Sequence, residues 1–237
     1  MKKIKAFAIV LSVLLCMSLV CAFAACGEEE EQPDPPGVKT YTYEAEDTDI
    51  SNLSGPVFSG EASGYKMIMG QNTKHIKSND KVLSSVSNGY FVSYFNGIDS
   101  TMVFEFESDA AVEDNTLILR LASEWGTLKI NPNNIEIKVN DETLAYSEIT
   151  VSGERLSADG SKSEYRTPFK DFNIATNMKI VKGTNKVTLT VKARNYGLEG
   201  IEKYGPGVDC LKIKTKSTTT LTWDKLFEEN KDQIVDN

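Results

Sequence analysis

Tyr43-Glu44-Ala45-Glu46-Asp47 is the stretch from which the fold of this chain can be worked out. In an extended strand, successive side chains point to opposite faces, so we expect Tyr43 and Ala45 on one face and Glu44 and Glu46 on the other. Two carboxylates this close repel each other unless a cation or hydrogen-bond donors lie between them. The pair is therefore either a set of solvent-facing charges on an edge strand or part of a cation site.

A third carboxylate lies near the far end of the chain, in Gly207-Val208-Asp209-Cys210-Leu211-Lys212-Ile213. This segment has the alternation of a strand, and Asp209 stands near its beginning. If the first and last strands pair, Asp209 joins Glu44 and Glu46. Three carboxylates supply the oxygen ligands that a hard cation takes, and Ca²⁺ suits such a set best. From these residues alone, a calcium site where the first and last strands meet and a pair of solvent-facing charges both remain open.

Alternation of apolar and polar residues runs through most of the remaining chain. The turn signals Asn140-Asp141 and Gly183-Thr184-Asn185 border two of the alternating segments, and no long helical periodicity lies between them. This pattern is typical of an antiparallel β-sandwich, so we predict an all-β fold. The alternating segments are Met102–Glu107, Thr116–Ser123, Ile135–Val139 and Val187–Val191.

Two segments interrupt this pattern. Residues 151–170 are polar, with several glycines and serines, which predicts a long loop. In the tail, residues 217–237, Trp223, Leu226 and Phe227 fall at helical spacing. An aspartate and threonines beside them are suited to capping a helix. We therefore predict a short C-terminal helix that docks its apolar face on the sandwich.

The first 25 residues have the features of a secretory signal peptide. Three lysines form a positive region, an apolar run follows, and small residues precede Cys26. The apolar run is too short for a typical membrane span. Phe23-Ala24-Ala25-Cys26-Gly27 resembles a bacterial lipobox, in which the cysteine becomes the lipidated first residue, although Phe23 stands where leucine is usual. We predict lipidation of Cys26, and the alternative is ordinary cleavage at this point and free secretion.

Residues 26–38 form an acidic, proline-rich tether. Removal of residues 1–25 takes away three basic residues and no acidic one, so the net charge of −8 becomes −11. A domain this acidic is a poor candidate for binding nucleic acid. Cys210 is the only cysteine in the folded part, which excludes a disulfide framework. Anchor and tether together predict an extracytoplasmic protein that is held at the bacterial cell membrane by its lipid alone.

Four segments, in their order along the chain, resemble the carbohydrate-binding modules of families 6 and 35. The first is the opening stretch quoted above, and together the segments span nearly the whole mature domain, from about 43 to 215. The others resemble the family's Gly-aromatic-Val strand, its glycine-x-asparagine turn and its closing aspartate strand. They are Ser87-Asn88-Gly89-Tyr90-Phe91-Val92, Gly183-Thr184-Asn185-Lys186-Val187-Thr188-Leu189 and Val208-Asp209-Cys210-Leu211-Lys212-Ile213.

The resemblance implies a jelly-roll-like β-sandwich over residues 39–216, with a structural Ca²⁺. Glu44, Glu46 and Asp209 match the family's ligand positions. Gly207 is a departure, because family members often carry an asparagine there that reaches the sugar.

The resemblance also implies that a polysaccharide or oligosaccharide binds in loops at one end of the sandwich. There, aromatic rings stack on sugar faces while amides and carboxylates bind the hydroxyl groups. Trp125 is the best candidate, because a tryptophan just after a strand tends to be accessible, and the alternative is that it closes the end of the core. The candidates for ligand contact are Trp125, Phe169, Asn195 and Tyr196.

The usual materials of catalysis are scarce. The only histidine is His75, in a polar segment, and Cys210 has no base near it in sequence. No phosphate-binding loop and no zinc spacing occur. We therefore predict a protein that is not an enzyme. Two functions remain open: a sugar-binding surface lipoprotein, or a structural or adhesive envelope protein whose sandwich has lost the sugar. A solvent-open Trp125 ring favours the first, and a covered ring favours the second.

Overall fold

The structure is a computed structural model that describes residues 33–53, 68–70, 76, 80–159, 161–197 and 204–234. The chain divides into two compact units, Met1–Pro35 and Pro36–Asn237, and the second contains the folded domain. The predicted signal peptide, Cys26 and His75 lie outside the described residues. Within the described part, no helix is long and apolar enough to cross a membrane.

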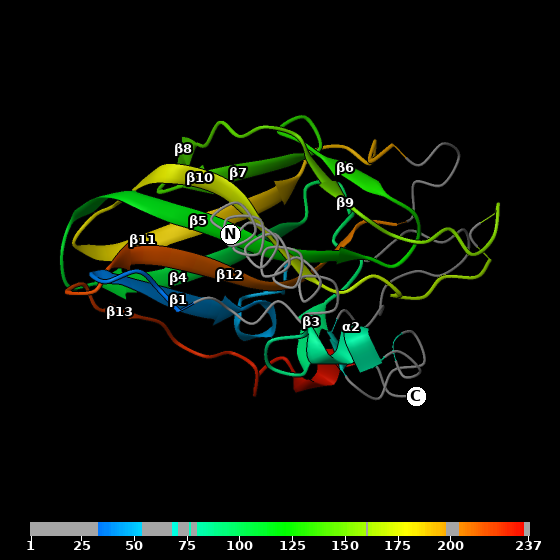
Figure 1. Cartoon of the computed structure of the whole chain (residues 1–237), viewed down its shortest axis with the longest axis horizontal. Coiled ribbons are helices and arrows are strands. Elements are labelled where there is room, and N and C mark those ends of the chain that lie inside the picture. The colour runs from blue at the N-terminus through cyan, green and yellow to red at the C-terminus, as the bar shows by residue number, and fades with distance from the viewer. Residues whose placement is uncertain are drawn as a thin grey trace, which may run out of the picture. The chain divides into compact units, whose positions relative to one another are not determined.

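Two antiparallel sheets form the domain (Figure 1). The first has the order β10-β5-β12-β3-β2, and β1 also pairs with β12. Its strands are β1 (Val38–Glu44), β2 (Ile68–Gly70), β3 (Tyr90–Val92), β5 (Val112–Ser123), β10 (Lys170–Ile180) and β12 (Pro206–Lys216). The second has the order β13-β4-β11-β7-β8. Its strands are β4 (Thr101–Ser108), β7 (Ile135–Val139), β8 (Glu142–Thr143), β11 (Gly183–Val191) and β13 (Leu221–Thr222).

The remaining elements are short. A two-stranded sheet pairs β6 (Leu128–Ile130) with β9 (Ile149–Val151). The helices are the 3₁₀ turns η1 (Ala45–Asp47) and η2 (Lys231–Gln233) and the single α-helix of the described part, α2 (Asp80–Ser84). The predicted all-β, antiparallel sandwich is thus confirmed.

The core lies between the two large sheets, as the alternation predicts. In β4, Phe104 and Phe106 are buried while Glu105 and Glu107 are exposed. The Tyr43 ring of the first sheet meets the Phe104 ring of the second edge-on, at a centroid distance of 5.2 Å. Aromatic pairs prefer this edge-to-face geometry, which adds to the burial of apolar area.

The turn predicted at Asn140-Asp141 is confirmed, whereas Gly183-Thr184-Asn185, also predicted as a turn, forms the first three residues of β11 and pairs with β4. Asn140 and Asp141, which join β7 to β8, both have positive φ angles, as a two-residue type I′ hairpin requires. Between β10 and β11, the chain turns beside the buried side chain of Asn185, which hydrogen-bonds the backbone groups of this turn. Its Nδ2 donates to the carbonyls of Val181 and Gly183, and its Oδ1 accepts from the Val181 N–H. The asparagine of this motif therefore holds the turn closed.

Strand β10 does not follow the alternation pattern. Its pairing with β5 shifts in register after Asn173, after Ala175 and after Met178. Each irregularity changes which residues face the core, so Ile174 and Ala175 are buried side by side. No period of two survives in the sequence, although the strand is eleven residues long. The irregular segment expected over 151–170 accordingly ends where β10 begins.

The tail differs from the predicted helix, although it docks as expected. No helix begins at Asp224, and the only helical turn of the described tail is η2, a 3₁₀ turn. The Trp223 ring stacks on Tyr43 with a centroid distance of 4.8 Å. Phe227 packs on Tyr90 at 4.9 Å. The tail also adds β13 to the second sheet by pairing with β4. Its apolar residues therefore pack on the sandwich from an extended chain and do not form one face of a helix.

Candidate functional site

The first and last strands pair as predicted, and their pairing brings carboxylates together. Strand β1 runs antiparallel to β12, with Glu44 opposite Cys210 and Tyr43 opposite Leu211. Tyr43 and Leu211 belong to the core cluster. Because side chains alternate along each strand, Glu44 and Cys210 lie on the outer face of the sheet.

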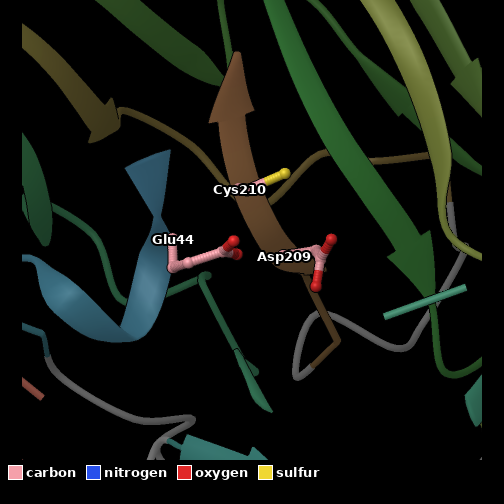
Figure 2. A group of neighbouring side chains, drawn as sticks. All are labelled: Glu44, Asp209 and Cys210. Atoms are coloured by element: carbon pink, nitrogen blue, oxygen red, sulfur yellow. The ribbon is translucent and has the colours of Figure 1, made fainter. Parts of the chain in front are cut away.

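A β-bulge turns Asp209 toward the same place. In the pairing of β12 with β5, Val208 lies opposite Leu121 and Cys210 opposite Arg120, so Asp209 is an extra residue. Asp209 and Cys210 both lie outside the core cluster, although they are neighbours in a strand. Figure 2 shows both side chains projecting from β12 and the Glu44 carboxylate extending toward them. A carboxylate oxygen of Glu44, one of Asp209 and the Cys210 sulfur lie within 4.8 Å of one another.

Glu46 is not a member of this close group, although the charges of Glu44 and Asp209 act on its carboxyl, and its backbone differs from the one predicted. Strand β1 ends at Glu44, and Glu46 lies in the 3₁₀ turn η1, so the two residues do not alternate along one strand. The turn is closed by the N–H and hydroxyl of Thr48, which both donate to the Ala45 carbonyl. The Glu46 side chain is fully buried. The expectation of a common strand face was therefore wrong for Glu46, yet the turn carries its carboxyl inward.

The segment after α2 supplies hydrogen-bond donors to the cluster. The Ser87 N–H lies 3.1 and 3.2 Å from the two carboxylate oxygens of Asp209, and the Ser87 hydroxyl donates to Glu44 Oε2. Asn88 Nδ2 donates to Glu46 Oε1 at 3.2 Å. The Arg120 guanidinium lies 3.4 Å from Asp209 Oδ2. Glu46 and Asp209 are thus buried and Glu44 is partly exposed, and the Arg120 guanidinium is a cationic side chain in contact with Asp209.

Burial disfavours the charged form of each of these carboxyls. It raises the pKa of Glu44 to about 7, that of Glu46 to about 8 and that of Asp209 to about 6. The charges of Glu44 and Asp209 raise the pKa of Glu46 further, and the Ser87 hydrogen bonds and Arg120 partly offset the effect of burial at Asp209. Among the described residues, hydrogen bonds and nearby positive charges thus offset the effect of burial only in part.

The residues of this cluster fit a hard cation. Glu46 Oε2 is buried and has no hydrogen-bond partner within the described part of the chain. An unsatisfied carboxylate oxygen beside two other carboxylates is the arrangement that a calcium ion, with its six to eight oxygen ligands, satisfies. The pKa of the Cys210 thiol is raised, mainly by burial, so this soft group stays protonated beside the oxygens. Glu44, Glu46 and Asp209 are the residues that would hold the ion.

The aromatic residues predicted to contact sugar are all buried. Trp125 is 0% exposed, so its expected accessibility is not found. The Tyr204 ring stacks on the Trp125 ring at a centroid distance of 5.7 Å. The Arg155 guanidinium lies 4.6 Å from the centre of the Trp125 ring. Phe169 and Tyr196 are 2% and 1% exposed.

Asn195 is the exposed member of the four predicted contacts. It lies at the same end of the sandwich as Trp125. The Gly126 N–H donates to the Glu154 carbonyl, and the Lys129 N–H donates to the Tyr196 carbonyl. The segment after Trp125 therefore lies between the loop that contains Glu154 and the loop that contains Asn195 and Tyr196. The rim of this end is consequently polar, whereas its aromatic rings lie beneath the surface.

Gly207, the departure from the family pattern, has a structural explanation. A Cβ atom at this position would lie 2.7 Å from the hydroxyl oxygen of Tyr165 and 3.0 Å from its ring. Tyr165 is fully buried, bonds to the Ser93 hydroxyl at 2.8 Å and packs edge-on against Phe91. Residue 165 comes from the long loop after β9. The loop therefore fills the space that a side chain at position 207 would need.

The comparisons with known proteins concern the fold alone. No family model and no curated protein matches the chain. Among solved structures, a family 35 carbohydrate-binding module from Clostridium thermocellum is 17% identical over 74% of this chain and 97% of that one, with a TM-score of 0.41. A similar module from Paenibacillus barcinonensis is 18% identical over 78% of this chain and 99% of that one, with a TM-score of 0.38. A mannanase from Podospora anserina matches over 28% of its own length and 76% of this chain, at 17% identity and a TM-score of 0.41.

The raised pKa values predict how stability depends on pH without added cation. The ordinary values are 4.5 for the two glutamates and 3.8 for Asp209, so between about pH 4 and pH 8 the folded state binds more protons than the unfolded state. Stability must then fall as the pH rises through this window. Thermal unfolding in a chelator should give a lower melting temperature at pH 8 than at pH 5. Glu46→Gln should flatten the profile, and an unchanged profile in that variant would contradict a charged cluster.

The contact between Gly207 and Tyr165 predicts a second outcome. Gly207→Ala should destabilise the domain by about 1–3 kcal/mol, because the new methyl group overpacks against the ring. Tyr165→Phe removes the closest oxygen atom, so the double variant should lose less stability than the sum of the two single variants. Denaturant unfolding of all four proteins measures this coupling, and additive losses would show that the two residues do not touch.

Proposed function

We propose that the sandwich is a non-catalytic carbohydrate-binding module whose fold is stabilised by Ca²⁺. The observation that supports this most strongly is the convergence of Glu44, Glu46 and Asp209. They stand at the positions that the sequence resemblance assigns to calcium. In support, a strand pairing and a bulge bring Glu44 and Asp209 together, and Glu46 follows in the 3₁₀ turn with its carboxyl under the charges of both. A cluster of desolvated acids costs free energy unless something positive balances it.

Calcium in this role supplies charge and oxygen coordination. It binds the ionised carboxylates of the first strand, of η1 and of the last strand, and so ties together segments that are distant in the sequence. Ser87 and Arg120 hold Asp209 from the other side. Loss of the ion leaves three acids that must either repel one another or take up protons.

For the sugar, the described rim at the Trp125 end offers polar groups. Asn195 is exposed there, and the Arg155 side chain is exposed while its guanidinium covers the Trp125 ring. Amide and guanidinium groups suit sugar hydroxyl groups as hydrogen-bond donors. Contact through a polar rim involves a modest area, so a dissociation constant on the order of micromolar to millimolar follows. Many copies on one cell would strengthen retention of a polymer through multivalency.

The second candidate is a structural or adhesive protein of the cell envelope. Its specific support is the burial of Trp125, Phe169 and Tyr196, together with the Tyr165 ring that occupies the space beside Gly207. In that case the calcium site would hold the fold together and no sugar would bind.

The lipid anchor completes the proposal. Cys26 follows two alanines and precedes an acidic tether, which supports lipidation and retention at the outer side of the bacterial membrane. Mass spectrometry of protein purified from its native membrane should show a diacylglycerol-modified Cys26 as the first residue. A free Cys26 thiol at steady state, or a chain that starts elsewhere, would contradict the anchor.

Calcium binding should appear as added stability. With free Ca²⁺ at 100 to 1,000 times its dissociation constant, the fold gains roughly 2.7 to 4.1 kcal/mol by mass action. The melting temperature of the wild type should fall on chelation and return with Ca²⁺ but not with the same ionic strength of Na⁺. Asp209→Asn is the matched variant, in which this calcium response should be lost. An unchanged wild-type melting temperature would argue against the ion.

A glycan array separates the two candidate functions. The wild-type domain, loaded with Ca²⁺, should retain at least one polysaccharide, and Asn195→Ala or Arg155→Ala should weaken that binding while the melting temperature stays almost the same. Asn177→Ala changes an exposed asparagine of β10 beside the start of β5, whereas Trp125 follows the end of β5, and serves as the matched control. Absence of binding on every glycan would favour the structural or adhesive function.

A further inference from the structure

The C-terminal segment Trp223–Ile234, here called the strap, lies beyond the family-like part of the chain. It leaves β13, passes beside β1 and ends near β3 and α2 (Figure 1). Ring contacts with Tyr43 and Tyr90 hold it at two points, and Ile234 forms a β-bridge with Ile68. The strap thus crosses the region in which the first strand becomes η1.

The strap contacts η1 through several polar groups. Asn230 Nδ2 donates to the Glu46 carbonyl at 2.9 Å and to the Thr48 carbonyl at 2.8 Å. The Leu226 N–H donates to the Asp47 carbonyl at 3.1 Å. These bonds all reach main-chain carbonyls from Glu46 to Thr48, and the Asn230 carboxamide donates two of the three.

These contacts matter because Glu46 does not sit on a strand. Glu44 and Asp209 are positioned by the ladder between β1 and β12, which continues over seven residue pairs. Glu46 has no such ladder, and a 3₁₀ turn of three residues has poor hydrogen-bond geometry of its own. Its side chain has Asn88 as its hydrogen-bond partner at Oε1. The strap therefore supplies hydrogen bonds to the backbone that carries this carboxylate, in addition to the packing of η1 against β3 and β12.

We propose that the strap is a positioning element of the cation site, with Asn230 as its central residue, so that cation binding and strap docking are thermodynamically linked. This inference rests on the calcium site proposed above. Asn230 aims the Glu46 carboxylate by fixing the carbonyls of η1. Because linkage is reciprocal, a strap that favours Ca²⁺ binding is itself held more firmly when Ca²⁺ is bound.

The direct test is the calcium affinity of strap variants, measured by isothermal titration calorimetry on the complete domain. Asn230→Ala removes two hydrogen bonds to η1 and should weaken Ca²⁺ binding by about tenfold. Asn230→Asp is nearly isosteric but turns acceptors toward two carbonyls, so it should weaken binding at least as much. Lys231→Ala is the matched control, because it breaks only an exposed ion pair with Glu228 and should bind Ca²⁺ like the wild type.

The outcomes separate this inference from the proposed function. Circular dichroism without Ca²⁺ first establishes that each variant keeps the sandwich. If the wild type binds no Ca²⁺, both the cation site and the role of the strap are overturned. If the wild type binds and both Asn230 variants bind equally well, the cation site stands and the strap is only a structural appendage.

Limited proteolysis tests the reciprocal effect. Trypsin can cut the strap after Lys225 or Lys231, whose side chains are exposed. Calcium should slow the appearance of the shortened chain several-fold in the wild type, and Glu46→Gln should remove this protection. Equal cleavage rates with and without Ca²⁺ in a wild type that binds the ion would contradict the linkage.

Discussion

The fold of this domain depends on how it accommodates the buried carboxyl groups of Glu46 and Asp209 and the partly exposed one of Glu44. Removing a carboxylate from water is unfavourable, and neighbouring carboxylates add mutual repulsion. Ser87, Asn88 and Arg120 offset part of this cost with hydrogen bonds and one positive charge. They leave Glu46 Oε2 without a partner. Such a cluster lowers the stability of the fold unless a ligand balances it, and this cost is the basis of the calcium proposal.

A strand pairing, a β-bulge and a 3₁₀ turn position the three carboxyl groups. Pairing of β1 with β12 brings the two ends of the domain together, and the bulge at Asp209 places two successive side chains of β12 outside the core. The turn η1 follows at once, and the tail covers it. Each device lies at an element boundary or an irregularity, where side-chain direction is set by local geometry rather than by strand alternation.

Much of the framework was predictable from the sequence. Strands such as β4 and β7 alternate without interruption, and Asn140-Asp141 marks a turn that only a few residue types adopt. The closeness of Glu44 and Asp209 followed from assuming that the first and last strands pair. Strand β10 was missed because three shifts in register erase its period. The extended course of the tail was missed because the spacing of Trp223 and Phe227 fits both a helix and a docked chain.

The environment of the aromatic residues was beyond the reach of sequence patterns. A tryptophan after a strand is exposed or covered according to what the loops do, and residues 151–170 carry no periodicity that predicts their course. In the structure, Arg155 from this loop covers the Trp125 ring. Tyr165, from the same loop, fills the space beside Gly207. The nearest available signal was Gly207 itself, since a glycine in place of a side chain that reaches the ligand indicates that something else occupies its space.

Crystallography is the most direct test of the proposal that Glu44, Glu46 and Asp209 bind one calcium ion. Crystals grown with Ca²⁺ and measured at a long wavelength reveal the ion by its anomalous scattering. If these residues bind the ion, one strong peak should lie about 2.3–2.6 Å from oxygens of all three carboxylates. Well-ordered side chains with no peak between them, and Glu46 Oε2 still without a partner, would contradict it.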